Sequence, residues 1–197
     1  FLEYHDAESA PWLVSAIEAA TTPRPKLYRT SVAINGTIPA LNDPDDLKRV
    51  VDSYQGANTF KVKVGTNLAE DLVRVNFIRD LRPQAKIRID VNGLWSVDQA
   101  EAFLSADGDI EYVEQPCATV EELRELKEKL HIRIPIAGDE VLRKARDPFA
   151  IDLTGAVDIL MLKVQPLGGI ARAYKLAKHH NLPVVVSSAL ESEVGIS

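Results

Sequence analysis

Apolar residues in this chain gather in short runs rich in valine and isoleucine, and longer segments with a helical period separate these runs. This alternation predicts strands joined by helices, and near-continuous apolar strands are typical of a parallel sheet that helices cover. The runs that we interpret as strands are 29–35, 59–64, 85–91, 110–113, 134–137, 159–162 and 184–186.

Residues suited to cap helices precede most of the helical segments. These N-cap candidates are Asp43 before Pro44, Asn67, Ser96 and Thr119. A short helical segment over 9–20 precedes a proline-rich break, and a pair of glycines, 168–169, precedes a helix expected to reach His180. The fold class that follows is α/β, a (β/α) TIM-type barrel of which seven strands are visible.

An open doubly wound sheet fits the same alternation. No G-x-G-x-x-G fingerprint follows an early strand, so nothing specific supports that alternative. The 197 residues fall short of the roughly 250 that are usual for a complete barrel. We therefore expect an interior piece of a longer protein, whose eighth strand and helix lie beyond Ser197.

Composition narrows the classes of partner. The chain is 46% hydrophobic and 26% charged, with a net charge of −6 and both signs interspersed, so nucleic acid and anionic membrane surfaces are not expected partners. No apolar stretch is long enough to span a bilayer. The single cysteine, Cys117, cannot form an intrachain disulfide, which favours a reducing, cytoplasmic location.

Charged residues recur at the ends of successive predicted strands. Asp90, Glu114, Asp139 and Lys163 are 24, 25 and 24 residues apart, about the length of one strand–helix unit. They should occupy equivalent positions on neighbouring strands, and in a barrel such positions meet at the C-terminal mouth, where active sites lie. Converging carboxylates need a cation, and oxygen ligands without histidine or cysteine favour Mg²⁺, with Mn²⁺ as the alternative.

Lysines flank this predicted metal site on two sides. Lys61 and Lys63 share one face of a strand because they are two residues apart. Two ammonium groups held together near Mg²⁺ should depress each other's pKa, as a lysine base requires. Lys163 comes four strands later, so the lysines could move protons on both faces of a carbon next to a carboxylate. A bound cation would stabilise the negative charge that proton removal creates.

Each feature also has an ordinary structural interpretation. A lysine pair on a strand is usually a solvated face, and an aspartate at a strand end is usually a cap or turn residue. An acid or a lysine at the ends of five successive strands, with nearly constant spacing, argues against the ordinary interpretation of all these residues together. Residues with a weaker claim to bind substrate or support the site are Asn92, Glu140, Ser187 and Ser188.

The Lys61/Lys63 strand, the three acids and the opposing Lys163 resemble the muconate-lactonising-enzyme-like subgroup of the enolase superfamily. That resemblance implies the proton abstraction and Mg²⁺-stabilised enediolate already known for the superfamily. It also implies that residues 1–22 are a remnant of an N-terminal α+β capping domain and that 23–197 form the barrel domain. A small-molecule carboxylate is the expected substrate, and a homo-oligomer is compatible with the pattern.

Within the subgroup, the segments 56–65, 90–96, 114–117 and 187–192 look most like o-succinylbenzoate synthases of the actinobacterial type. The resemblance implies that Lys63 removes the α-proton of 2-succinyl-6-hydroxy-2,4-cyclohexadiene-1-carboxylate and then helps expel hydroxide as water, in menaquinone biosynthesis. Lys61 would tune Lys63, and Lys163 would stabilise the intermediate. N-acylamino-acid racemases and dipeptide epimerases share this machinery and remain an alternative. A non-catalytic barrel scaffold and a Schiff-base aldolase using Lys163 are alternatives of other classes.

Overall fold

The computed structural model describes residue 6 and residues 8–23 and 30–189. Its strands form one parallel sheet in which every strand pairs with the next one along the chain. The strands are β1 (Gly36–Ile38), β2 (Thr59–Lys63), β3 (Lys86–Asp90), β4 (Tyr112–Glu114), β5 (Ile136–Gly138), β6 (Ile159–Lys163) and β7 (Val184–Ser187). A doubly wound sheet would reverse its order at a switch point, so the sequential order favours the barrel.

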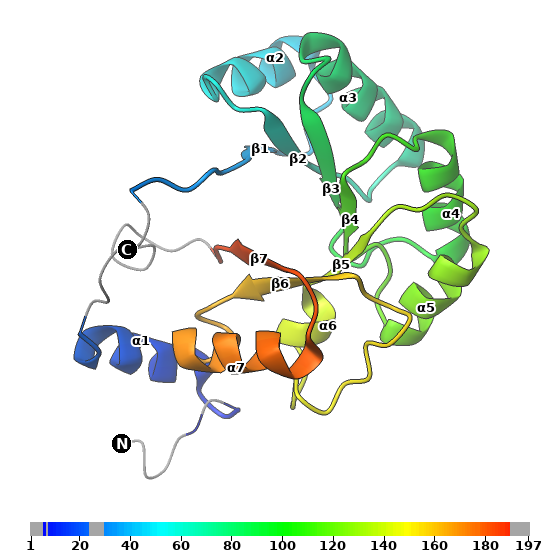
Figure 1. The fold of residues 1–197 in the computed structure, drawn as a ribbon. Helices are drawn as coiled ribbons and strands as arrows, with labels where there is room; N and C mark the ends of the chain where they lie inside the picture. Colours follow the sequence, from blue (N-terminus) through cyan, green and yellow to red (C-terminus); the bar gives the residue numbers. More distant parts are fainter. Residues whose placement is uncertain (1–5, 7, 24–29, 190–197) are drawn as a thin grey trace.

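The sheet curls into a half-barrel with helices on its convex side (Figure 1). The helices are α1 (Pro11–Thr21), α2 (Pro44–Ser53), α3 (Leu68–Leu81), α4 (Val97–Ala106), α5 (Val120–Lys129), α6 (Glu140–Arg143) and α7 (Ile170–His180). The predicted N-caps are confirmed. Asp43 and Asn67 accept backbone hydrogen bonds at the starts of α2 and α3, and Ser96 and Thr119 form capping boxes with Gln99 and Glu122.

The first predicted strand was wrong. Residues 30–35 form no strand, residue 29 lies outside the described part, and β1 begins only at Gly36. The apolar side chains that suggested a strand, Val32 and Ile34, are 73% and 83% exposed. Gly36 instead allows a close approach of the backbone, because a Cβ there would lie 2.9 Å from ring atoms of Phe60 and Tyr54. The six other strands lie where they were predicted.

Alternation along β2 and β3 separates an apolar outer face from a polar inner face. On β2 and β3, Phe60, Val62, Ile87 and Ile89 join the main core against the helices. The intervening residues, Lys61 among them, point into the curl of the sheet. A second, small apolar cluster of Tyr112, Ala137 and Met161 lines the inner face of β4–β6. The inner face therefore carries the candidate chemistry.

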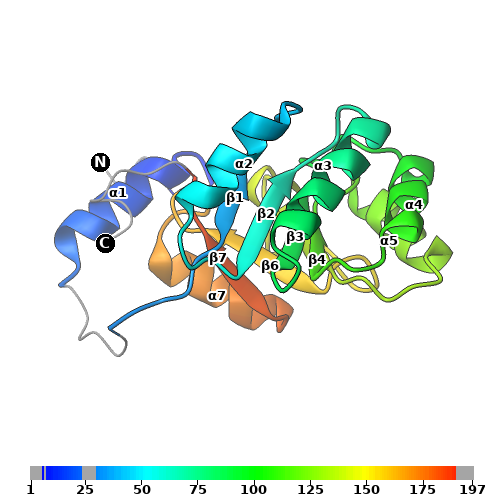
Figure 2. The same cartoon turned by 90° about the horizontal axis from the view of Figure 1, so that it is seen from above.

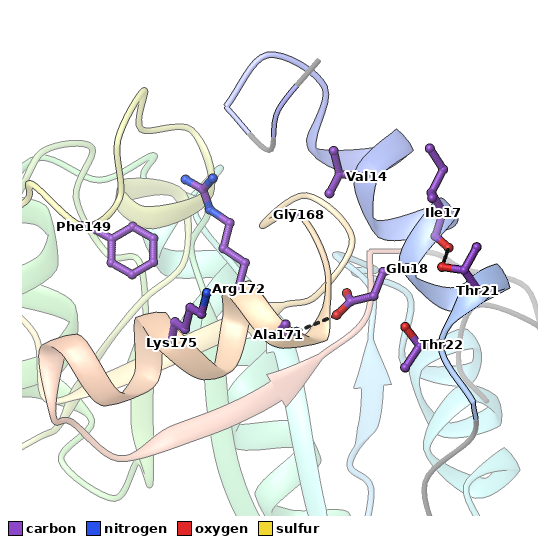
Figure 3. A pocket seen from close by; sticks show the side chains of 10 residues that line it. All are labelled: Val14, Ile17, Glu18, Thr21, Thr22, Phe149, Gly168, Ala171, Arg172 and Lys175. Carbon is purple, nitrogen blue, oxygen red and sulfur yellow. Dashed lines mark hydrogen bonds between the residues drawn. The ribbon is translucent and has the colours of Figure 1, made fainter. Parts of the chain in front are cut away.

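Helix α1 packs beside α7 on the outside of the half-barrel (Figures 1 and 2). A cavity of about 510 Å³ lies between them, and Glu18 of α1 points to the start of α7 (Figure 3). Its Oε1 accepts the backbone N–H of Ala171 at 3.0 Å, and Gly169 leaves the room for this carboxylate. The cavity contains none of the residues predicted for the site. No helix in the described ranges is long and apolar enough to cross a membrane.

Candidate active site

The predicted carboxylates come together at the C-terminal end of the sheet. Asp90 and Glu114 are the last residues of β3 and β4 and pair directly in the register of the two strands. Asp139 directly follows β5 and precedes α6. All three side chains have no exposed surface. Buried carboxylates require compensating positive charge, and the predicted lysines supply it.

The two lysines of β2 meet the same carboxylate. The Nζ atom of Lys61 lies 2.8 Å from Asp90 Oδ2 and 2.7 Å from Glu114 Oε2. The Nζ atom of Lys63 lies 2.5 Å from Asp90 Oδ2 and donates to Asn92 Oδ1 at 2.9 Å. The predicted shared face is confirmed. The two lysines differ in exposure, because the Lys61 side chain is 11% exposed and that of Lys63 is 36% exposed.

Lys163 lies on the other flank, on β6. Its Nζ donates to Asp139 Oδ2 at 2.5 Å. Arg143 of α6 also contacts Asp139, with Nε 3.1 Å from Oδ1, and its Nη2 donates to Glu140 Oε1 at 2.5 Å. The sequence did not suggest Arg143. The spacing of four residues between Asp139 and Arg143 could have indicated this contact, because residues four apart on a helix lie on the same face.

Asn92 links the two flanks. While its Oδ1 accepts from Lys63, its Nδ2 donates to Glu140 Oε1 at 3.2 Å. Its backbone is left-handed, with φ 55°, and its N–H donates to Asp90 Oδ1 at 3.2 Å. Asparagine tolerates this conformation better than most residues. The supporting role expected of Asn92 and Glu140 stays a prediction, and their positions are compatible with it.

A further buried residue, Gln115, cross-links β4 to the start of α6. Its Oε1 accepts the backbone N–H groups of Asp139 at 3.0 Å and Val141 at 3.2 Å, and its Nε2 donates to Cys117 O at 2.9 Å. Its φ of 41° is left-handed, which is uncommon outside glycine and marks a constrained position next to Glu114. The sequence analysis assigned no role to Gln115 and so missed it.

Burial and charge set the pKa values in the cluster. Burial alone would lower the pKa of Lys61, but the charges of Glu114 and Asp90 outweigh it and raise that pKa. Burial raises the pKa of the Glu114 carboxyl to about 7, with Lys61 opposing and the negative charges of Asp90 and Asp139 adding to it. For Lys61 the direction is opposite to the expected depression, which presupposed a cation among the carboxylates. Lys61 therefore stays charged.

The two serines lie at the end of β7. Ser187 pairs with Lys163 in the strand register and is half-buried, and Ser188 is exposed. This places them at the same end of the sheet as the lysines, and their substrate-binding role stays a prediction. Residues 190–192 of the segment that suggested that role lie outside the described residues.

The three acids are the candidate ligands of the predicted cation. Within the described ranges, no group of three or more His, Cys, Asp or Glu side chains is arranged as it stands to hold a metal ion. Lysines and Arg143 occupy the carboxylates instead. Both oxygens of the fully buried Glu114, however, receive no hydrogen bond from the described residues, and Lys61 contacts one of them only as an ion pair. A buried carboxylate without donors fits a cation ligand, and the all-oxygen donor set suits Mg²⁺.

A curled parallel sheet with acids and lysines at its C-terminal strand ends defines a class of α/β barrel domain. The sequence model of the family described as "Enolase C-terminal domain-like" matches residues 45–197, and the chain belongs to this family.

Among curated proteins, the chain is 49% identical over 202 residues to an o-succinylbenzoate synthase of Mycolicibacterium smegmatis. The match covers 100% of this chain and 61% of that protein, so the chain spans less than two thirds of its relative.

Solved structures agree on the fold. The L-Ala-D/L-Glu epimerase of Bacillus subtilis aligns with a TM-score of 0.75 and 28% identity, over 86% of this chain and 50% of that one. A dipeptide epimerase of Enterococcus faecalis, solved with Mg and the dipeptide L-Leu-L-Tyr, aligns with a TM-score of 0.71 and 27% identity. That match covers 83% of this chain and 49% of the epimerase.

Proposed function

We propose that this chain carries the barrel of a Mg²⁺-dependent o-succinylbenzoate synthase, which dehydrates 2-succinyl-6-hydroxy-2,4-cyclohexadiene-1-carboxylate. The observation that carries the proposal is the pairing of Lys61 and Lys63 with Asp90 and Glu114 at adjacent strand ends, opposite Lys163. The 49% identity to a mycobacterial synthase over the whole chain supports this choice of reaction. The division at residues 22 and 23 into a capping remnant and a barrel domain is part of the same proposal.

Asp90, Glu114 and Asp139 would hold the cation. When bound, Mg²⁺ would supply positive charge that stabilises the extra negative charge on the substrate carboxylate. Glu114 offers it two oxygens that receive no hydrogen bond from the described residues. The Asn92 N–H donates to the Asp90 carboxylate, and Gln115 holds the backbone at Asp139, so both help to keep the ligand positions fixed.

Lys63 is the base in this proposal. It is the more exposed of the two lysines on β2, with 36% of its side chain exposed, whereas Lys61 is 11% exposed and lies between Asp90 and Glu114. In its neutral form, Lys63 takes the proton from the carbon next to the carboxylate. The same proton then joins the departing hydroxyl group, water leaves, and the ring becomes aromatic. Lys163, on the opposite flank, contributes its charge alone.

An epimerase is the second candidate, because Lys63 and Lys163 come from opposite flanks and a solved epimerase shares the fold. The two reactions separate in deuterated water with the complete protein and Mg²⁺. The synthase predicts loss of the cyclohexadiene absorbance and formation of the aromatic product, which chelation of the metal abolishes. Sustained deuterium exchange at the α-carbon of N-acylamino acids or dipeptides, without that dehydration, would establish the epimerase instead.

A further inference from the structure

An ion pair behind the site has no part in the proposed chemistry. Asp71 and Arg74, both on α3, are 0% and 2% exposed, and Arg74 Nη1 lies 2.6 Å from Asp71 Oδ1. Arg74 is the largest fully buried side chain of the described residues. Burial of such a pair carries a desolvation cost that only complete hydrogen bonding offsets. The hydrogen-bond partners of the remaining donors and acceptors therefore show which parts of the backbone the pair fixes.

Two of these contacts hold the end of β2. Arg74 Nη1 donates to the carbonyl of Lys63 at 3.1 Å, and Asp71 Oδ2 accepts the N–H of Gly65 at 2.8 Å. The ladder between β1 and β2 ends where Ile38 pairs with Val62. The Lys63 carbonyl lies one residue beyond that ladder, so Arg74 supplies the donor that no strand provides.

The same guanidinium also reaches the loop after β1. Its Nε donates to Leu41 O at 2.6 Å, and its Nη2 donates to Asn42 Oδ1 at 2.5 Å. Val64, between the two held residues, donates its N–H to Asp90 O at 3.0 Å. The strand end that carries Lys63 is thus fixed toward α3, toward the loop and toward β3.

We propose that Asp71 and Arg74 are positioning residues for Lys63. Neither contacts a site carboxylate or a lysine Nζ in the described residues, so they act through the backbone. The Lys63 side chain is long and 36% exposed, so its Nζ can be placed reproducibly only if its backbone is fixed. The inference rests on the proposed role of Lys63 as the base.

The first test is Arg74→Met in the complete protein, assayed well below its unfolding temperature. We expect kcat to fall about ten- to a hundred-fold, with KM within about two-fold, because a small displacement of a catalytic group costs rate and leaves binding intact. The isotope effect on removal of the α-proton should rise. Arg74→Lys should recover part of the rate, because one ammonium group replaces some of the donors.

A double variant separates positioning from stability. Asp71→Leu together with Arg74→Met removes both buried charges, so stability should return toward that of the wild type. Positioning predicts that kcat stays low in this variant, because the Lys63 carbonyl still lacks its donor. A return of kcat together with stability would overturn the proposal. This variant and Arg74→Lys also serve if Arg74→Met does not fold.

Arg79→Met on the same helix is the matched control. Arg79 pairs with Asp107 at 2.8 Å, in the loop before β4 and therefore at the other end of the sheet. It should lose stability and keep kcat. If the wild type dehydrates the substrate and Lys63→Ala does not, a normal kcat in Arg74→Met disproves the positioning role and leaves the proposed function intact. If the wild type has no dehydratase activity, the proposed function fails and the positioning role falls with it.

Discussion

The two flanks of the strand ends neutralise their buried acids in different ways. On β2–β4, Lys61 lies between Asp90 and Glu114, and Glu114 has no other partner among the described residues. On β5–β6, Asp139 is shared by Lys163 and Arg143. Glu114 on the first flank therefore depends on a single ammonium group, whereas Asp139 on the second flank is held by two cations. A bound Mg²⁺ should matter most where positive charge is scarcest.

The largest effect expected from this comparison concerns activity. Lys63→Ala should lower kcat by about 10²–10⁴-fold, the range for loss of a general base, and should leave Mg²⁺ binding largely intact. Kinetic assays of the complete protein, with metal binding followed by calorimetry, measure both. Retained turnover would show that another residue is the base. Parallel loss of metal binding would show that Lys63 is needed to build the site.

The next prediction compares the flanks directly in metal-free protein. Lys61→Met leaves the buried Glu114 carboxylate without its ammonium group and Asp90 with Lys63 alone, so it should cost about 3–5 kcal/mol of unfolding free energy. Lys163→Met should cost only about 1.5 kcal/mol, the lower end for a hydrogen bond between charged groups, because Arg143 still pairs with Asp139.

Denaturant unfolding in a chelator, repeated with Mg²⁺, measures these differences. Added Mg²⁺ should stabilise Lys61→Met more than the wild type, because the cation replaces the lost positive charge. Equal costs for the two variants, or no difference in the response to Mg²⁺, would remove the distinction between the flanks.

Spacing along the chain predicted which acids and lysines meet at the strand ends, because the strand–helix unit of a parallel barrel repeats at nearly constant length. Asp90, Glu114, Asp139 and Lys163 each end a unit of 24 or 25 residues, so their common location followed from the topology alone. The caps of the helices were equally predictable, because Ser96 and Thr119 bond to residues only three positions away. Local chemistry and regular repeats can be read from one sequence.

Contacts between distant residues could not be predicted in this way. Gln115 meets Asp139 across 24 residues, and Arg74 meets the loop before α2 across 33. Nothing in their spacing distinguishes them from surface residues. The first strand was misplaced for a related reason, because the closeness of Gly36 to Phe60 is a packing effect between strands, while the apolar run before it is exposed.

Gln115 provides a smaller test of how the flanks are joined. Gln115→Leu keeps the size of the side chain but leaves the N–H groups of Asp139 and Val141 without their acceptor, at a cost of about 1–3 kcal/mol. Weaker Mg²⁺ binding should accompany this loss, because Asp139 is no longer held against β4. Gln55→Leu, at an exposed position, is the control and should change neither quantity. Normal metal affinity in Gln115→Leu would show that Gln115 does not support the metal site.

The smallest effect is expected at the N-cap of an outer helix, α5. Thr119→Ala removes the hydroxyl that accepts the Glu122 N–H at 3.2 Å, so α5 should lose about 1 kcal/mol of capping stability. Thr119→Ser keeps the hydroxyl and should retain most of it. Because the hydrogen bonds of this cap are made to Glu122 of α5, kcat and Mg²⁺ affinity should stay at wild-type values in both variants. A change in kcat or in Mg²⁺ affinity would mean that a loss of stability in an outer helix alters the strand ends. The effects predicted for the Lys61 and Gln115 variants could then also result from lower stability alone.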